Sequence, residues 1–212
     1  MRTWARATAA LLAVAGIAVL AWVGVTLVWG EPYTAIKAAR AQEALGRELE
    51  RQESAWAVSA SARPAATRTQ QALTFQRELR QGDALGRLVI PRLGLRTVVV
   101  EGTDADELAR GPGHYPSTSL PGLGGTVAVA GHRTTYSQPF RHIDELRAGD
   151  RIELTTQYGS FQYVVYAREI VDDHDWSIVR RRSFEQIVLS ACHPLYSASE
   201  RIVVFARLRS VV

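Results

Sequence analysis

The sequence is poor in cysteine and in lysine: among its 212 residues, Cys192 is the only cysteine and Lys37 the only lysine. A single cysteine excludes a disulfide within the chain and a zinc site built from cysteine pairs. A Gly-rich phosphate loop, a Rossmann fingerprint and a Walker motif are also missing, so nothing in the sequence indicates a bound nucleotide. The basic residues are scattered arginines, apart from 180–182, without interleaved aromatic residues, which excludes a clear nucleic-acid signal.

A long uncharged run near the N-terminus predicts a membrane span. Residues 7–29 carry no charge, and at 1.5 Å per residue they extend roughly 34 Å, enough to cross the hydrocarbon core of a bilayer. Arg2 and Arg6 precede the run, which favours a cytoplasmic N-terminus at 1–6. We therefore expect a single-pass protein of the cell membrane, with an anchor at 7–29 and the rest outside the cytoplasm.

A cleaved signal peptide is the alternative reading of this run. Its apolar region is normally shorter, about 7–15 residues, with a small-x-small cleavage site close behind. Residues 39–41 (Ala-Arg-Ala) have that form but lie ten residues beyond the run. An uncleaved anchor fits the pattern better.

The stretch after the apolar run has the composition of a stalk. Residues 34–53 are rich in Ala, Glu and Arg, and their apolar residues are small and sparse, which predicts a solvated helix. Residues 59–69 have linker composition, and 73–79 fit a short helix. We interpret 30–82 as a spacer between the membrane and a C-terminal module at 83–212. A loosely ordered tail over 54–72 is equally consistent with the sequence of that segment.

From residue 83 onward, short runs of β-branched residues recur between Gly, Pro and Asp, as is typical of strands. Two short helices fit between them, at 104–108 and at 139–146, the second packing Phe140, Ile143 and Leu146. Seven or eight short strands in this length predict a mainly β fold, closed or nearly closed into a barrel. The expected strands are 87–91, 97–101, 125–130, 151–156, 161–171, 186–192 and 201–208.

Cys192 is the first candidate for chemistry, because it ends an apolar strand and has no partner for a disulfide. A thiol needs a base or a charge nearby to become a nucleophile, and a buried cysteine without one is an ordinary small hydrophobe. His193 is a poor partner because neighbouring side chains of an extended chain point to opposite faces. His132 is the best-placed base, since it ends a strand of small residues that lets another element come close.

The other histidines have plainer explanations. His142 is expected on the outer face of the helix at 139–146, and His114 in a turn. His174 lies among Asp172, Asp173 and Asp175, which fits a solvated loop better than an ion site.

Arg201 begins the strand that follows Cys192. If the two strands pair as an antiparallel hairpin, Cys192 and Arg201 face each other. A guanidinium there can hold a thiolate, an oxyanion or a substrate carbonyl. A strand-end arginine paired with Glu200 or with water is the alternative.

These residues lie in stretches that resemble the sortases, membrane-anchored cysteine transpeptidases of Gram-positive bacteria. The matching stretches are GPGHYP (111–116), AGHRTTYSQPF (130–140), LSACHP (189–194) and ERIVVFARL (200–208). These motifs are most similar to those of the actinobacterial class E sortases, with class D next. The resemblance implies an eight-stranded sortase barrel with short helices over 83–212. It puts His132, Cys192 and Arg201 on the catalytic positions.

The resemblance also implies a reaction and its partners. A sortase cleaves a C-terminal sorting motif of a secreted protein between Thr and Gly, here LAxTG-like or LPxTG-like. It passes the acyl group from a Cys thioester to an amine of a lipid-linked peptidoglycan precursor. Tyr115 is expected to help select Ala over Pro at the second motif position. No cofactor or resident metal is expected, although calcium assists some sortases and Asp172, Asp173 and Asp175 form an acidic run.

One departure from the family pattern concerns the residues before the cysteine. Sortases usually have Thr-Leu-x-Thr-Cys, whereas here Val188 and Ala191 replace both threonines. A hydroxyl contact to substrate from position 191 is therefore lost, while its backbone N–H would survive. Three alternatives stay open: a pilin-polymerising sortase, a Cys/His hydrolase, and a catalytically weak sortase-like binding protein.

Overall fold

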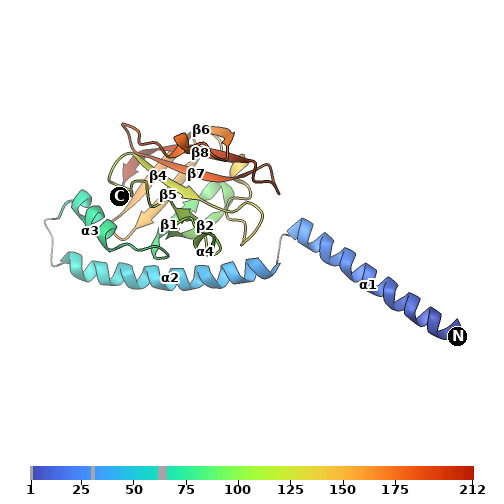
Figure 1. Ribbon diagram of the computed structural model, residues 1–212. Helices are drawn as coiled ribbons and strands as arrows, with labels where there is room; N and C mark the ends of the chain where they lie inside the picture. The colour runs from blue at the N-terminus through green and yellow to red at the C-terminus, as the bar shows by residue number, and fades with distance from the viewer. Residues whose placement is uncertain (1, 30–31, 62–65) are drawn as a thin grey trace.

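The computed structural model describes residues 2–29, 32–61 and 66–212, in which three helices precede a β-barrel (Figure 1). The helices are α1 (Arg2–Trp29), α2 (Pro32–Ser61), α3 (Arg68–Glu78) and α4 (Ala105–Leu108), with 3-10 turns η1 (Pro91–Leu93), η2 (Ile143–Glu145) and η3 (Trp176–Val179). The strands are β1 (Ala84–Ile90), β2 (Leu95–Glu101), β3 (Gly113–His114), β4 (Thr126–Ala130), β5 (Arg151–Thr156), β6 (Gly159–Asp172), β7 (Gln186–His193) and β8 (Glu200–Val211).

Within the described residues, eight strands close into a barrel in the order β1-β2-β3-β4-β7-β8-β6-β5. Most neighbours run antiparallel, but β2 and β3 are parallel, and so are β4 and β7, whose carboxyl ends therefore lie at the same edge. β8 flanks β7 on its other side in antiparallel register. The predicted mainly β, eight-stranded barrel is confirmed.

Alternation along the strands separates a barrel core from a second apolar layer outside it. In β7, Ile187, Leu189 and Ala191 belong to the barrel core, while Val188 belongs to an outer cluster. We call this set the outer cluster: Ala128, Ile178, Val188, Val203 and Phe205. Because side chains alternate along a strand, Cys192 shares the outer face with Val188.

The helix predicted at 34–53 is present within α2, but α2 lies along the barrel, so the expectation that this helix is solvated is wrong (Figure 1). Leu45 and Leu49 are fully buried in one cluster with residues of β1 and β2. The amide of Gln42 accepts from the Val98 N–H at 2.8 Å and donates to the Val98 carbonyl at 3.0 Å. Two leucines four residues apart form a narrow apolar stripe on α2. The sequence did not reveal this stripe because the other apolar residues of the helix are small and few.

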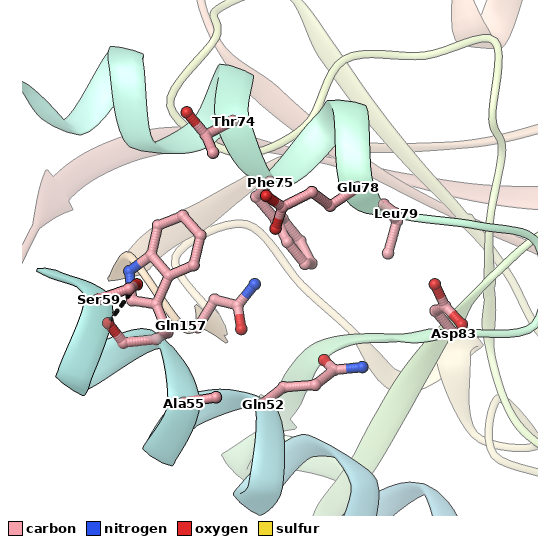
Figure 2. A pocket seen from close by; sticks show the side chains of 10 residues that line it. Gln52, Ala55, Ser59, Thr74, Phe75, Glu78, Leu79, Asp83 and Gln157 are labelled. Atoms are coloured by element: carbon pink, nitrogen blue, oxygen red, sulfur yellow. Dashed lines mark hydrogen bonds between the residues drawn. The ribbon is translucent and has the colours of Figure 1, made fainter.

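Helix α3 also packs on the barrel, and a cavity of about 400 Å³ lies between it and α2 (Figure 2). Phe75 of α3 is buried in the barrel core and meets Trp56 of α2 edge to face, with ring centroids 6.5 Å apart. Gln52 lines this cavity, and its buried Oε1 has no hydrogen-bond partner among the described residues.

Helix α1 has the length and composition of a membrane span. Its segment Trp4–Val25 comprises 22 residues with a mean hydropathy of 2.3, and none of it is buried against the rest of the protein. In Figure 1 it projects away from the barrel. The N-terminal apolar helix therefore fits a membrane anchor.

The predicted helix at 139–146 is reduced to the single 3-10 turn η2, although its packing residues are correct. Phe140, Ile143 and Leu146 are all buried in the barrel core. Hydrogen bonds from the Ile143 N–H to the Phe140 carbonyl and from the Leu146 N–H to the Ile143 carbonyl hold these three residues in successive short turns. The two-residue strand β3 was too short to leave a pattern in the sequence.

Candidate active site

The strand register brings the predicted nucleophile and base to one edge of the barrel. Ala130 of β4 pairs with Ser190 of β7 in parallel, and the Gly131 N–H donates to the Ser190 carbonyl at 3.0 Å. His132 and Cys192 each lie two residues beyond that pair. Because the register of a parallel pair is constant along the strands, His132 and Cys192 lie next to each other at the carboxyl ends of β4 and β7.

Cys192 and Arg201 are directly opposite each other in the antiparallel pair of β7 and β8. The hairpin predicted from the sequence is present. Nη1 of Arg201 donates to the Ala198 carbonyl at 2.8 Å and to the Glu200 carbonyl at 3.0 Å, which holds the connecting loop. A guanidinium has five N–H groups, so this use of Nη1 does not exhaust its capacity to bind an oxyanion.

His132 is half-buried, and desolvation by burial lowers its pKa below the ordinary 6.5. The ring of Tyr136 lies against it, with centroids 5.1 Å apart and planes tilted by 32°. At neutral pH the imidazole is therefore predominantly uncharged. An uncharged imidazole can accept a proton from a neighbouring thiol and later return it to a leaving amine.

The small residues before His132 serve the close approach that the sequence suggested. The ring of Phe140 packs against Gly131, where any Cβ would collide with it. The Phe140 N–H also donates to the His132 carbonyl at 3.0 Å. Glycine at 131 thus lets an aromatic anchor fix the backbone at the histidine.

Arg133 is a site residue that sequence reasoning missed. Its side chain is only 3% exposed, and its Nη1 donates to the Cys192 carbonyl at 3.4 Å and lies 3.3 Å from His193 Nδ1. Nη2 donates to Asp144 Oδ1 at 2.9 Å, and Nε to the Arg141 carbonyl at 3.4 Å. One buried guanidinium therefore ties the histidine segment to the cysteine segment. The only feature of the sequence that could have identified Arg133 as a site residue is its position directly after His132, the candidate base.

Tyr115 and Ala191 lie on different faces of β7. The hydroxyl of Tyr115 is 3.3 Å from the Ser190 hydroxyl, and its ring packs on the outer cluster, on the face that carries Cys192. The side chain of Ala191 is 3% exposed and belongs to the barrel core. Any contact of Ala191 with a substrate would therefore come from its backbone.

The remaining histidines lie apart from this arrangement. His142 is exposed and pairs with Glu145 at 2.9 Å. His114 lies in β3 and not in a turn, where it is buried with its Nδ1 2.7 Å from Glu101 Oε2. Because Nε2 of His114 lies 3.0 Å from the Thr118 hydroxyl, this imidazole braces the loop that follows Tyr115.

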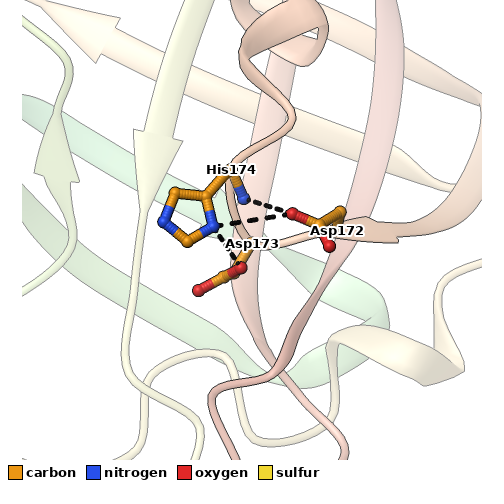
Figure 3. A group of neighbouring side chains, drawn as sticks. All are labelled: Asp172, Asp173 and His174. Atoms are coloured by element: carbon orange, nitrogen blue, oxygen red, sulfur yellow. Dashed lines mark hydrogen bonds and ion pairs between the residues drawn. The ribbon is translucent and has the colours of Figure 1, made fainter.

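The acidic run at the end of β6 forms an exposed turn (Figure 3). His174 Nδ1 lies 2.6 Å from Asp173 Oδ1 and 3.6 Å from Asp172 Oδ1, and its side chain is 84% exposed. Asp175 accepts from the Ser177 N–H at 2.8 Å, and hydrogen bonds from Ser177 lower the pKa of Asp175. Asp172 accepts from the His174 N–H at 2.9 Å, so Asp172 caps the turn and Asp175 caps η3. The expectation of no resident cofactor stays a prediction.

The barrel resembles known sortases in sequence and in structure. A family model for the sortase domain matches residues 88–209. Sortase D of Bacillus subtilis is 36% identical over 130 residues, or 59% of this chain, which spans only 64% of that relative's length.

Two solved structures share the fold. Sortase E of Streptomyces avermitilis has a TM-score of 0.58 at 33% identity, over 63% of this chain and 92% of that one. A Clostridium perfringens Sortase D5 transpeptidase has a TM-score of 0.67 at 24% identity, over 81% and 99%. The matched residues 88–209 cover more than half of this chain and include His132, Cys192 and Arg201, and the chain belongs to the sortase family of cysteine transpeptidases.

Proposed function

We propose that this protein is a membrane-anchored sortase that cleaves a C-terminal sorting motif between Thr and Gly and transfers the acyl group to an amine of a peptidoglycan precursor. The main observation that supports this proposal is the strand register. Cys192 of β7 lies opposite Arg201 of β8, and β7 also pairs with β4, the strand that leads into His132. A nucleophile, a base and an oxyanion donor are the minimum set for acyl transfer through a covalent intermediate.

In the first half-reaction, Cys192 transfers its proton to His132 and its sulfur attacks the carbonyl carbon of the motif threonine. A C–S bond forms, and the carbonyl oxygen becomes an oxyanion that Arg201 stabilises. Collapse of this intermediate breaks the C–N bond, and His132 gives its proton to the leaving glycine amine. The product is a thioester on Cys192.

In the second half-reaction, an acceptor amine attacks the thioester carbon. His132 takes a proton from the amine, the new C–N bond forms, and the C–S bond breaks. The departing sulfur regains its proton from His132. The same two side chains thus act in reverse order, with no net change in the enzyme.

We further propose that residues 1–6 lie in the cytoplasm, that residues 7–29 of α1 span the membrane once, and that the barrel faces outward. Secreted substrates and a lipid-linked acceptor both lie at the outer leaflet under this topology. Anchoring then raises their concentration near Cys192. Arg2 and Arg6, which precede the apolar run at 7–29, support this orientation.

Mass spectrometry of the full chain with LAxTG and LPxTG peptides and a glycine-like amine tests the proposal. We expect a thioester on Cys192 and a transfer product that grows with amine concentration at the expense of hydrolysis. Cys192→Ala should form neither, and Arg201→Ala should lose about a hundredfold or more in kcat. An acyl adduct that persists in Cys192→Ala would overturn the proposal, and hydrolysis unaffected by amine would indicate a hydrolase.

The same assay with both peptides in competition tests the role proposed for Tyr115. Its hydroxyl and ring border the outer face of β7 two residues before Cys192, which is where a motif residue upstream of the cleaved bond would lie. Tyr115→Phe should weaken the preference for Ala over Pro. An unchanged preference would reject the role and leave Tyr115 as a packing residue.

A further inference from the structure

The first turn of α2 contacts the loop that follows His132. The Tyr136 N–H donates to Thr34 Oγ1 at 3.3 Å, and the Ser137 hydroxyl donates to the Ala35 carbonyl at 3.2 Å. In each bond the two residues lie 102 positions apart in sequence, so these contacts depend on the docking of α2. The membrane-proximal end of α2 therefore reaches the edge of the barrel that carries the candidate active site.

Tyr136 connects this contact to the catalytic imidazole. Its backbone binds Thr34, and its ring lies against the ring of His132 at 5.1 Å. The aromatic face limits the access of water to the imidazole from that side. A shift of this loop would therefore change both the orientation and the solvation of His132.

The loop has a backbone conformation that needs support from outside. Tyr136, Ser137 and Gln138 have φ values of 50°, 62° and 50°, and none of them is glycine. Left-handed φ values are disfavoured for side-chain-bearing residues, and three in succession persist only where surrounding contacts hold them. The Gln138 N–H is held inside the loop, by the Thr135 carbonyl at 2.9 Å. Tyr136 and Ser137 each have a bond to α2.

The position of α2 is itself fixed. Gln42 bonds to both backbone groups of Val98, and Leu45 is fully buried against β1 and β2. The loop thus rests on an element that is anchored to β1 and β2, and α2 begins only three residues after α1 ends.

We propose that the first turn of α2 is a positioning element of the active site, in which Thr34 and Ala35 hold the loop 135–138 and the loop holds Tyr136 against His132. Thr34 and Tyr136 are positioning residues, since they act through His132. The inference rests on the proposed role of His132 as acid and base. It implies that the barrel is fully active only with α2 docked.

The test uses the full chain in lipid nanodiscs, with kcat/KM and the NMR titration of carbon-13-labelled histidine as two readouts. Thr34→Val removes the acceptor and should lower kcat/KM about three- to tenfold, whereas Thr34→Ser keeps the hydroxyl and should restore it. Tyr136→Ala should lower kcat/KM and raise the pKa of His132 toward its ordinary value. Tyr136→Phe keeps the ring and the backbone donor, so relative to Tyr136→Ala it should recover kcat/KM and return the pKa of His132 to its lowered value.

Thr69→Val, the same change on an exposed position of α3, is the matched control. The inference is overturned if Thr34→Val and Tyr136→Ala leave both the titration of His132 and kcat/KM equal to those of this control. A titration that moves in both variants supports the inference even if His132→Asn retains turnover. In that case the role of His132 fails separately, because the NMR readout does not depend on catalysis.

Discussion

At the scale of single residues, Arg133 connects the His132 segment to the Cys192 segment more directly than any residue chosen from the sequence. Its guanidinium reaches the Cys192 carbonyl, His193, Asp144 and the Arg141 carbonyl from a nearly closed site. The planar fork of arginine can serve several acceptors at once, and a lysine ammonium cannot cover the same span. Arg133 therefore fixes the distance between the end of β4 and the end of β7.

We expect Arg133→Lys to lower kcat/KM by about 10- to 100-fold, since one or more charge-assisted hydrogen bonds are lost. The substitution keeps the charge, so the loss reports geometry. The rate of Cys192 alkylation against pH should change much less than turnover. The control is Arg147→Lys, at an exposed position, and equal turnover in the two variants would contradict the bridging role.

The burial of His132 predicts the sign of the pH dependence of kcat/KM. Because desolvation lowers its pKa below 6.5, the imidazole stays uncharged to a lower pH than an exposed histidine does. Only the uncharged ring can take the proton of Cys192, so activity is lost as the pH falls through this lowered value. The acid limb of kcat/KM should have its midpoint below pH 6.5, measured from about pH 4.5 to 9. A midpoint above 6.5 would show that another group controls the limb.

The same shift affects stability in one direction. The folded protein binds this proton less tightly than the unfolded chain does, so protonation favours unfolding. The contribution of His132 to stability is therefore lost as the pH falls below about 6.5, and activity and stability decline on the same side.

At the scale of elements, α2 is held by one amide that satisfies several backbone groups of the barrel. Gln42 binds the N–H and the carbonyl of Val98, the Thr97 hydroxyl and the Arg110 carbonyl. Gly111 leaves room for it, since any Cβ there would collide with the amide. The helix is thus bound by a few specific hydrogen bonds and by the narrow stripe of Leu45 and Leu49.

Gln42→Ala should lower the free energy of local opening of α2 by about 2–4 kcal/mol, because partly buried groups of β2 lose their partners. Hydrogen–deuterium exchange of the full chain in nanodiscs measures this as faster exchange over α2 and at the Val98 N–H, with the other barrel strands unchanged. Arg40→Ala, at an exposed position of the same helix, should have no such effect. Uniform acceleration across the barrel would mean that α2 and the barrel open together.

The elements differ in how much of their structure the sequence could predict. The pairing of Cys192 with Arg201 followed from two strands and a short loop, because a hairpin fixes its own register. The docking of α2 could not be predicted, because Leu45, Leu49 and Gln42 have no recognisable pattern in the sequence and make their contacts with β2 only in the folded chain. Arg133 was equally hidden, because its acceptors come from positions 141, 144 and 192, which only the folded chain brings together.

At the scale of the whole molecule, successive contacts link the apolar helix α1 to the imidazole of His132. Helix α1 precedes α2 directly, the first turn of α2 holds the loop at Tyr136, and Tyr136 lies against His132. The proposed anchor and the candidate active site are therefore physically adjacent, although the barrel closes around a core of its own. Two effects of the N-terminal region have to be separated: concentration of the barrel at the membrane, and support of the loop.

A protease site introduced between α1 and α2 separates these two effects, since cleavage there releases the barrel with Thr34 and Ala35 still attached. We expect transfer to a lipid-linked amine in vesicles to fall by about a hundredfold, because the effective concentration provided by the tether is lost. Transfer to a soluble amine should stay unchanged, because the first turn of α2 still supports the loop. Equal losses with both acceptors would assign the effect of cleavage to the active site, and no loss with either would remove the proposed purpose of the anchor.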